Sequence, residues 1–261
     1  LLNAALRGGA DLELEELRDQ IKKEGAVPFE YLMSAKDGAA EVFLTLTSVL
    51  QRDQRDRFSL VHARLAQYLR PERTDAHLMT AEILRDQGQY GLAAKTYERV
   101  DVNDPMFYTA EVGRAEALIE ADRRDAAVEV LRGLTRSHGD IANVHMSLGD
   151  ALRGGERWEE SEQAYNTAID MLPEFAANHW FLFYARGITH ERQKLWNDAE
   201  ADFRKSLSLS PGQPLSLNYL GYSLIERGEK MTEALGMIEK AVEARPSSGF
   251  IADSLGWARY R

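Results

Sequence analysis

Histidine offers the widest choice of chemistry in this sequence, because a neutral imidazole can bind a metal ion or move a proton near neutral pH. The six histidines are spread along the chain, with no HExxH or other pair at the spacing of metal ligands. They are His62, His77, His138, His145, His179 and His190. His77 and His145 occupy equivalent places in two similar segments, which favours a packing role. We therefore expect no metal site.

Motifs that bind phosphate or position a catalytic nucleophile are also absent from the sequence. The sequence has no GxxxxGK[ST], no GxGxxG after a strand and no GxSxG. The pair Gly154–Gly155 lies between two expected helices, where a turn explains it. Cysteine is absent, which excludes disulfides and thiolate metal ligands. We expect a protein that is not an enzyme and that needs no cofactor.

The composition of the chain excludes some classes of partner. The formal net charge is −10, whereas a general nucleic-acid binder needs a basic face, so we expect no nucleic-acid partner. No apolar run approaches the roughly 18–20 residues of a membrane span, so none is expected in this sequence. With only seven prolines among abundant Ala, Leu, Glu and Arg, the chain favours helix.

The sequence repeats itself with a period of about 34 residues. YLGYSLIERG (Tyr219–Gly228) and SLGWARYR (Ser254–Arg261) each contain Leu, Gly and an aromatic residue in the same order. Small residues continue this series at Ala81, Ala115, Gly149, Gly187, Gly221 and Gly256. A second series consists of Pro71, Pro105, Pro173, Pro211 and Pro246, and a third of Ala93, Ala127, Ala199 and Ala234. A fixed period of this length indicates stacked structural units.

Each unit predicts two helices joined by a short turn. The first helix carries an apolar–small pair such as Leu148–Gly149 and breaks at a polar, glycine-containing segment such as RGGERW (153–158). The second helix has apolar residues at i, i+3 and i+4, as in AEADFRKSL (199–207), and stops near the proline. The small residues would let neighbouring helices cross at about 8–10 Å.

Period, small residues, mid-unit turn and closing proline together resemble the tetratricopeptide repeat, over roughly residues 40–261. The resemblance implies an all-α fold, a right-handed superhelical solenoid of stacked helix–turn–helix repeats. It also implies a scaffold whose concave surface, lined mainly by the first helix of each repeat, binds other proteins. Residues 218–261 further resemble large proteobacterial members, many of them exported. That resemblance implies a bacterial protein in the periplasm or at the outer membrane, with the cytoplasm as the alternative.

We expect three segments along the chain. Residues 1–39 form an N-terminal helical region or divergent repeat, with an amphipathic helix over Ala10–Gly25 and a linker over Val27–Gly38. Residues 40–248 form six repeats, and residues 249–261 form the first helix of a truncated seventh repeat. The expected unit starts are Ala40, Thr74, Tyr108, Ala142, Trp180, Pro214 and Gly249.

The second, fifth, ninth and twelfth residues of each first helix should face the concave surface. In the last repeats these positions predict a peptide-binding groove formed by Phe181, Tyr184, Ile188, Asn218, Tyr222, Phe250, Trp257 and Tyr260. An aromatic groove suits a peptide anchored by hydrophobic side chains, with Asn218 contacting the ligand backbone. The alternative is that these rings pack against neighbouring helices or a further repeat.

Earlier repeats place the acidic residues Glu82, Glu116 and Asp150 on the same expected surface, where they would repel a carboxylate. We therefore expect an apolar or basic ligand rather than an acidic one. The leading hypothesis is a non-enzymatic scaffold that binds a peptide or protein segment in its groove. The alternatives are an assembly component that self-associates end to end through apolar faces, and the regulatory region of a longer protein.

Overall fold

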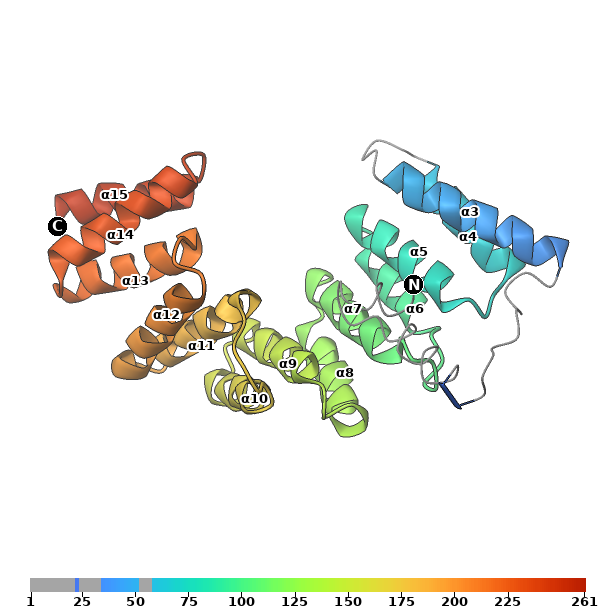
Figure 1. Cartoon of the computed structure of the whole chain (residues 1–261), viewed down its shortest axis with the longest axis horizontal. Coiled ribbons are helices and arrows are strands. Elements are labelled where there is room, and N and C mark those ends of the chain that lie inside the picture. The colour runs from blue at the N-terminus through green and yellow to red at the C-terminus, as the bar shows by residue number, and fades with distance from the viewer. Residues whose placement is uncertain (1–21, 24–33, 52–57) are drawn as a thin grey trace. The chain divides into compact units, whose positions relative to one another are not determined.

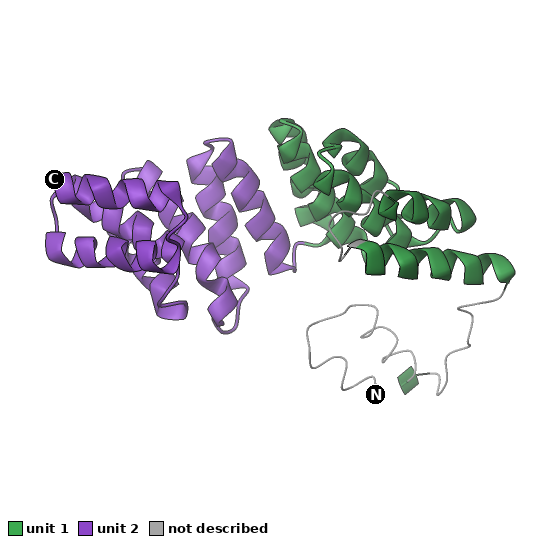
Figure 2. Ribbon diagram, turned by 90° about the horizontal axis from the view of Figure 1, so that it is seen from above, with its two compact units in different colours: residues 1–138 green, residues 139–261 purple. Residues whose placement is uncertain are grey.

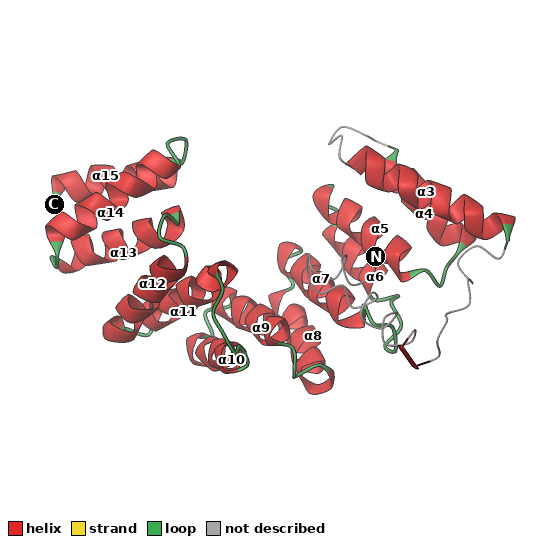
Figure 3. Ribbon diagram, in the orientation of Figure 1, coloured by secondary structure: helices red, strands yellow, loops and turns green. Residues whose placement is uncertain are grey.

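The computed structural model describes residues 22–23, 34–51 and 58–261, and throughout these residues the secondary structure is helical with no strand (Figures 1 and 3). The α-helices are α3 (Ala35–Gln51), α4 (Ser59–Leu69), α5 (Thr74–Asp86), α6 (Tyr90–Tyr97), α7 (Phe107–Glu120), α8 (Arg124–Ser137), α9 (Ala142–Gly154), α10 (Trp158–Asp170), α11 (Trp180–Arg192), α12 (Trp196–Leu209), α13 (Pro214–Arg227), α14 (Met231–Ala244) and α15 (Gly249–Tyr260). A short 3₁₀ helix, η2 (Ala177–His179), precedes α11. The fold is therefore all-α, as the sequence predicts.

Consecutive helices form hairpins, from α3 with α4 to α13 with α14, and α15 follows the last hairpin. The chain divides into two compact units, residues up to His138 and residues Gly139–Arg261 (Figure 2). The first helices of the last three hairpins and α15 begin at the residues where the sequence places unit starts. By contrast, α3 begins at Ala35, so Ala35–Gly38 are helical and do not form the end of a linker.

Most of the N-terminal region lies outside the described residues. This holds for the predicted helix over Ala10–Gly25, of which only Lys22 and Lys23 are described, and both are helical. It also holds for most of the linker expected over Val27–Gly38.

The turn inside the hairpins has a recurring backbone form. A residue with a positive φ between 58° and 72° stands two positions before the second helix, at Gly88, Asp122, Glu156 and Lys194. The N–H of the next residue donates to a carbonyl five residues earlier, for example Arg157 to Leu152 at 3.0 Å. This bond satisfies a carbonyl at the end of the first helix that has no partner inside that helix.

Small residues lie where helices touch. A Cβ atom added to Gly149 would come 2.6 Å from Cε1 of Tyr165, and one added to Gly187 would come 2.8 Å from Cε1 of Phe203. In the first unit Gly113 meets the ring of Tyr97 in the same way. The alanines of the third series, Ala93, Ala127, Ala199 and Ala234, are all fully buried. At these positions the small residues of the sequence therefore mark close helix contacts.

The long connection before α11 packs against helices of its own unit. Phe175 meets Phe183 edge-to-face, with ring centroids 5.0 Å apart. The Lys205 ammonium lies 4.8 Å from the centroid of the Phe175 ring. These contacts hold the inserted residues against α11 and α12.

Candidate functional site

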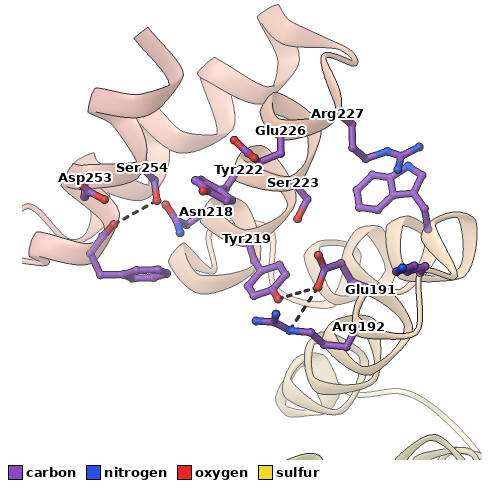
Figure 4. Close-up of a pocket in the computed structure, with 13 residues that line it drawn as sticks. Glu191, Arg192, Asn218, Tyr219, Tyr222, Ser223, Glu226, Arg227, Asp253 and Ser254 are labelled. Carbon is purple, nitrogen blue, oxygen red and sulfur yellow. Dashed lines mark hydrogen bonds and ion pairs between the residues drawn. The ribbon is translucent and has the colours of Figure 1, made fainter. Parts of the chain in front are cut away.

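A groove of about 580 Å³ lies in the second unit, among α11, α12, α13 and α15 (Figure 4). Its wall on α13 includes Asn218, Tyr222 and Glu226. These residues are four apart, so their side chains share one helix face. Phe250 and Asp253 line the opposite wall on α15.

Asn218 is buried in this groove, with 1% of its surface exposed. Its Oδ1 atom has no hydrogen-bond partner among the described residues. Tyr222 and Phe250, by contrast, are 40% and 61% exposed. The groove thus combines an unpaired buried acceptor with two large exposed rings, which is a costly arrangement unless another molecule meets it.

Charged side chains surround these groups. The Tyr219 hydroxyl donates to Glu191 at 3.3 Å, and burial together with the Glu191 charge raises the pKa of Tyr219 to about 12. Tyr219 therefore remains a neutral donor at physiological pH. Arg227 lies over the Trp196 ring, with its guanidinium carbon 4.7 Å from the centroid. Both Arg227 and Trp196 line the groove.

Three of the eight predicted groove residues lie elsewhere. Phe181 packs half-buried against the cluster around Tyr165 and Leu182. Tyr184 and Ile188 pack half-buried against the cluster that contains Phe203. None of the three lines the groove, because each packs against a core cluster instead.

The other five lie together on α13 and α15. Asn218, Tyr222 and Phe250 line the groove, and Trp257 and Tyr260 line a second pocket that also contains Tyr222. The rings of Trp257 and Tyr260 stack with their centroids 5.6 Å apart. The Trp257 Nε1–H donates to Glu226. The structure thus collects the predicted residues of the last two first helices and not those of α11.

The predicted acidic residues have basic or hydroxyl neighbours. Glu116 accepts from Arg85 at 2.6 Å, and the same guanidinium also pairs with Glu120. Asp150 accepts from the Tyr165 hydroxyl at 2.7 Å and lies 3.2 Å from Arg153. Burial, with the charge of Asp86, raises the pKa of Glu82 despite the opposing effect of Arg85. The negative charge expected at these positions is therefore largely compensated within the chain.

His77 and His145 make equivalent structural contacts. Nε2 of His77 lies 2.7 Å from the Pro71 carbonyl oxygen, and Nε2 of His145 lies 2.9 Å from that of Gly139. Because a carbonyl only accepts, each Nε2 donates, and each imidazole ties its helix to the residue that closes the previous repeat. Within the described ranges no group of three or more His, Cys, Asp or Glu side chains could hold a metal ion.

Several groove residues were not predicted from the sequence. Lys194 and Trp196 come from the turn and second helix of one hairpin, whereas the prediction considered only first helices. Tyr219, Glu226 and Arg227 lie on α13 beside the selected positions. The recurring aromatic residue after the turn, Trp196 here, is the signal that could have indicated this part of the wall.

These features define an α-helical repeat protein that presents a groove on the first helices of its last hairpins. The family model described as Tetratricopeptide repeat matches residues 60–105 and 112–174, so this part of the chain contains tetratricopeptide repeats. Proteins of this kind are typically interaction scaffolds without catalytic activity. None of the helices in the described part of the chain is both long and apolar enough to span a membrane.

Relatives and solved structures agree with this assignment. The TPR repeat-containing protein PA4667 of Pseudomonas aeruginosa is 27% identical over 187 residues, which are 71% of this chain. The chain spans only 31% of the length of that relative. A tetratricopeptide repeat protein from Parabacteroides merdae has a TM-score of 0.64 at 17% identity, covering 94% of this chain and 90% of that one. YrrB, described as a TPR protein with an unusual peptide-binding site, has a TM-score of 0.52 at 14% identity, covering 70% and 96%.

Proposed function

We propose that this protein is a non-enzymatic scaffold that binds a peptide or protein segment in the groove of its second unit. Asn218 carries the proposal, because it lines the groove and its buried Oδ1 atom has no partner within the described chain. Leaving such an acceptor unpaired costs roughly 1–3 kcal/mol, so a ligand that donates to it gains binding energy. A backbone N–H is such a donor and occurs along every peptide.

The exposed rings beside Asn218 supply the apolar part of the proposed contact. Tyr222 and Phe250 can each bury a large area against a ligand side chain, and aromatic residues dominate binding hot spots. An extended segment that places apolar side chains on these rings would bring its backbone to Asn218. The peptide-binding site named for YrrB supports the same use of a tetratricopeptide array.

Capture from a lysate of the source organism tests the proposal. We expect Tyr222→Ala combined with Phe250→Ala to abolish capture of the bound protein and to leave helical circular dichroism unchanged. Leu92→Ala is the control, because this exposed apolar residue lies on α6 in the other unit and outside both proposed surfaces. If the double variant captures the same protein as wild type, the groove is not the binding site.

A second candidate function, self-association, is favoured by the first hairpin. Seven large apolar residues are exposed on α3, on α4 and at the residue before α4: Val42, Leu46, Val49, Phe58, Val61, Leu65 and Tyr68. A gathering of exposed apolar residues on two paired helices is typical of interfaces. We propose that this face packs against an end of a second copy of the chain.

Light scattering over a range of protein concentrations tests self-association. In wild type the fraction of dimer should increase with protein concentration. The double variant Val42→Ser with Val61→Ser should remain monomeric, whereas the groove variant Tyr222→Ala should dimerise like wild type. A wild-type chain that remains monomeric at all concentrations would refute this second function.

We also propose a periplasmic or outer-membrane-associated location in a bacterium. The support for the location is the resemblance of residues 218–261 to large proteobacterial repeat proteins, many of them exported, and the relative in Pseudomonas aeruginosa supports a bacterial source. Release of the full-length protein by osmotic shock would support this location, and recovery with a cytoplasmic marker would refute it.

A further inference from the structure

A second, shallower pocket of about 470 Å³ continues the groove between α13 and α15. Tyr222 and Asp253 line both cavities, and Gly256, Trp257 and Tyr260 complete the second one. Because the two cavities share these residues, one extended ligand can occupy both of them.

The lining of this second pocket has the chemistry of a cation site. It consists of three aromatic side chains, one carboxylate and one glycine, with no basic side chain. The face of an aromatic ring carries negative charge density that attracts a cation. A second carboxylate, Glu226, accepts from the Trp257 indole and adds negative charge at its edge.

Asp253 is available to a ligand. Its side chain is exposed on α15, and within the described residues its carboxylate makes no hydrogen bond or ion pair. An anionic ligand group would be repelled here, and an apolar group would desolvate the carboxylate without compensation. A cationic side chain can pair with the carboxylate and also lie on the faces of the rings.

Guanidinium groups of the chain itself already lie on the indoles of this region. Arg227 lies 4.7 Å above the Trp196 ring, and Arg261 lies 5.7 Å from the centroid of Trp257. A planar guanidinium can lie flat on a ring while its N–H groups reach a carboxylate, whereas an ammonium cannot do both as well.

We propose that this pocket, lined by Tyr222, Asp253, Trp257 and Tyr260, binds an arginine side chain of the ligand. The guanidinium stacks on the rings and pairs with the Asp253 carboxylate, while neighbouring ligand residues occupy the groove at Asn218. This inference rests on the proposed function, because it assigns one residue of the peptide that the groove binds.

The probe is a phage-displayed library of random twelve-residue peptides, selected on the 261-residue chain. We expect the enriched peptides to share an arginine. Synthetic copies of the strongest peptide, with that arginine retained or replaced by lysine or by uncharged citrulline, would then be measured by isothermal titration calorimetry. Citrulline should weaken binding about three- to thirty-fold, and lysine less.

Variants of the protein locate the contact. Asp253→Asn should weaken the arginine peptide and leave the citrulline peptide unchanged, because the charge pair is then already absent. Glu243→Gln, at an exposed carboxylate of α14, is the matched control and should change neither affinity. Arg261→Ala should strengthen the arginine peptide, because it removes a guanidinium that competes for Trp257.

The outcomes separate the two proposals. Enriched peptides that lose affinity in Tyr222→Ala but contain no shared arginine, or that respond to Asp253→Asn equally with arginine and citrulline, overturn the arginine site alone. Enriched peptides whose affinity is unchanged in both Tyr222→Ala and Phe250→Ala, or the absence of any enriched peptide, overturn peptide binding in the groove as well.

Discussion

The Tyr165 ring lies directly against Gly149, so that a Cβ atom at position 149 would come 2.6 Å from Cε1 and 2.7 Å from Cδ1 of that ring. The ring is fully buried, and its hydroxyl donates to Asp150 while accepting from Arg153. Tyr165 is therefore fixed at both its face and its tip. Gly149 leaves space for it where α9 and α10 cross.

We predict that Gly149→Ala destabilises the protein by about 1–3 kcal/mol, since overpacking outweighs the gain in helix propensity. Gly256→Ala is the matched control, because Gly256 has the equivalent place on α15 and an added Cβ would meet nothing within 4 Å. There the alanine should stabilise by about 0.5–1 kcal/mol. Urea unfolding followed by circular dichroism measures both, and equal effects at the two sites would contradict the packing argument.

A second prediction concerns the turn between α9 and α10. Glu156 has φ +59°, which is unfavourable for a residue with a side chain, whereas the preceding Gly155 has φ −94°. Glu156→Gly should therefore stabilise by about 0.5–1 kcal/mol, and Gly155→Ala should be tolerated. Gly88 has φ +72° at the equivalent turn, so Gly88→Ala should destabilise. Thermal unfolding checks the order of the three variants, and a loss of stability in Glu156→Gly would contradict this account.

His190 should make stability depend on pH. Its Nδ1 lies 3.0 Å from Oδ2 of Asp202, and its Nε2 lies 3.6 Å from Oε1 of Glu162. Burial alone would lower the pKa of His190, but the adjacent carboxylate of Asp202, with the charge of Glu162, raises it despite the nearby guanidinium of Arg186.

Because the folded pKa of His190 lies above the ordinary value of about 6.5, its protonated form contributes stability below that pH. This contribution is lost as the pH rises through the raised pKa. The difference in unfolding free energy between wild type and His190→Gln should therefore shrink from pH 6 to pH 9 in urea titrations. Asp202→Asn should lower the pKa measured by NMR for the His190 ring, and a difference that grows with pH would refute the assignment.

The last prediction separates binding from stability at Asn218. Asn218→Leu keeps the shape of the side chain and removes the unpaired acceptor, so we expect about 1 kcal/mol of added stability together with weaker ligand binding. Asn166→Leu is the control, because its Oδ1 accepts from Arg186 at 2.7 Å and its loss should destabilise. Urea unfolding and calorimetry with a selected peptide measure the two effects. A destabilised Asn218→Leu would mean that the amide supports the fold.

The sequence alone determined the repeat architecture. The period, the small residues such as Gly149 and Gly187, and the recurring break placed α9, α11, α13 and α15 at their observed starts. This was possible because helix geometry and close helix crossings impose the same residue type at the same place in every repeat. The equivalent positions of His77 and His145 indicated packing for the same reason, and each imidazole meets a carbonyl six residues earlier.

Only the tertiary structure decided which side chains remain available. Glu116 is paired with Arg85 from the preceding repeat, 31 residues away. Tyr184 is covered by Tyr219, with ring centroids 5.9 Å apart, while Asn218 beside it is buried with an unpaired oxygen. Exposure and pairing depend on contacts between neighbouring repeats, and a periodic pattern within one helix carries no information about which long side chain reaches across. The glycine pair Gly154–Gly155 likewise indicated a turn without showing which residue adopts the left-handed conformation. In the structure that residue is Glu156, which follows the pair.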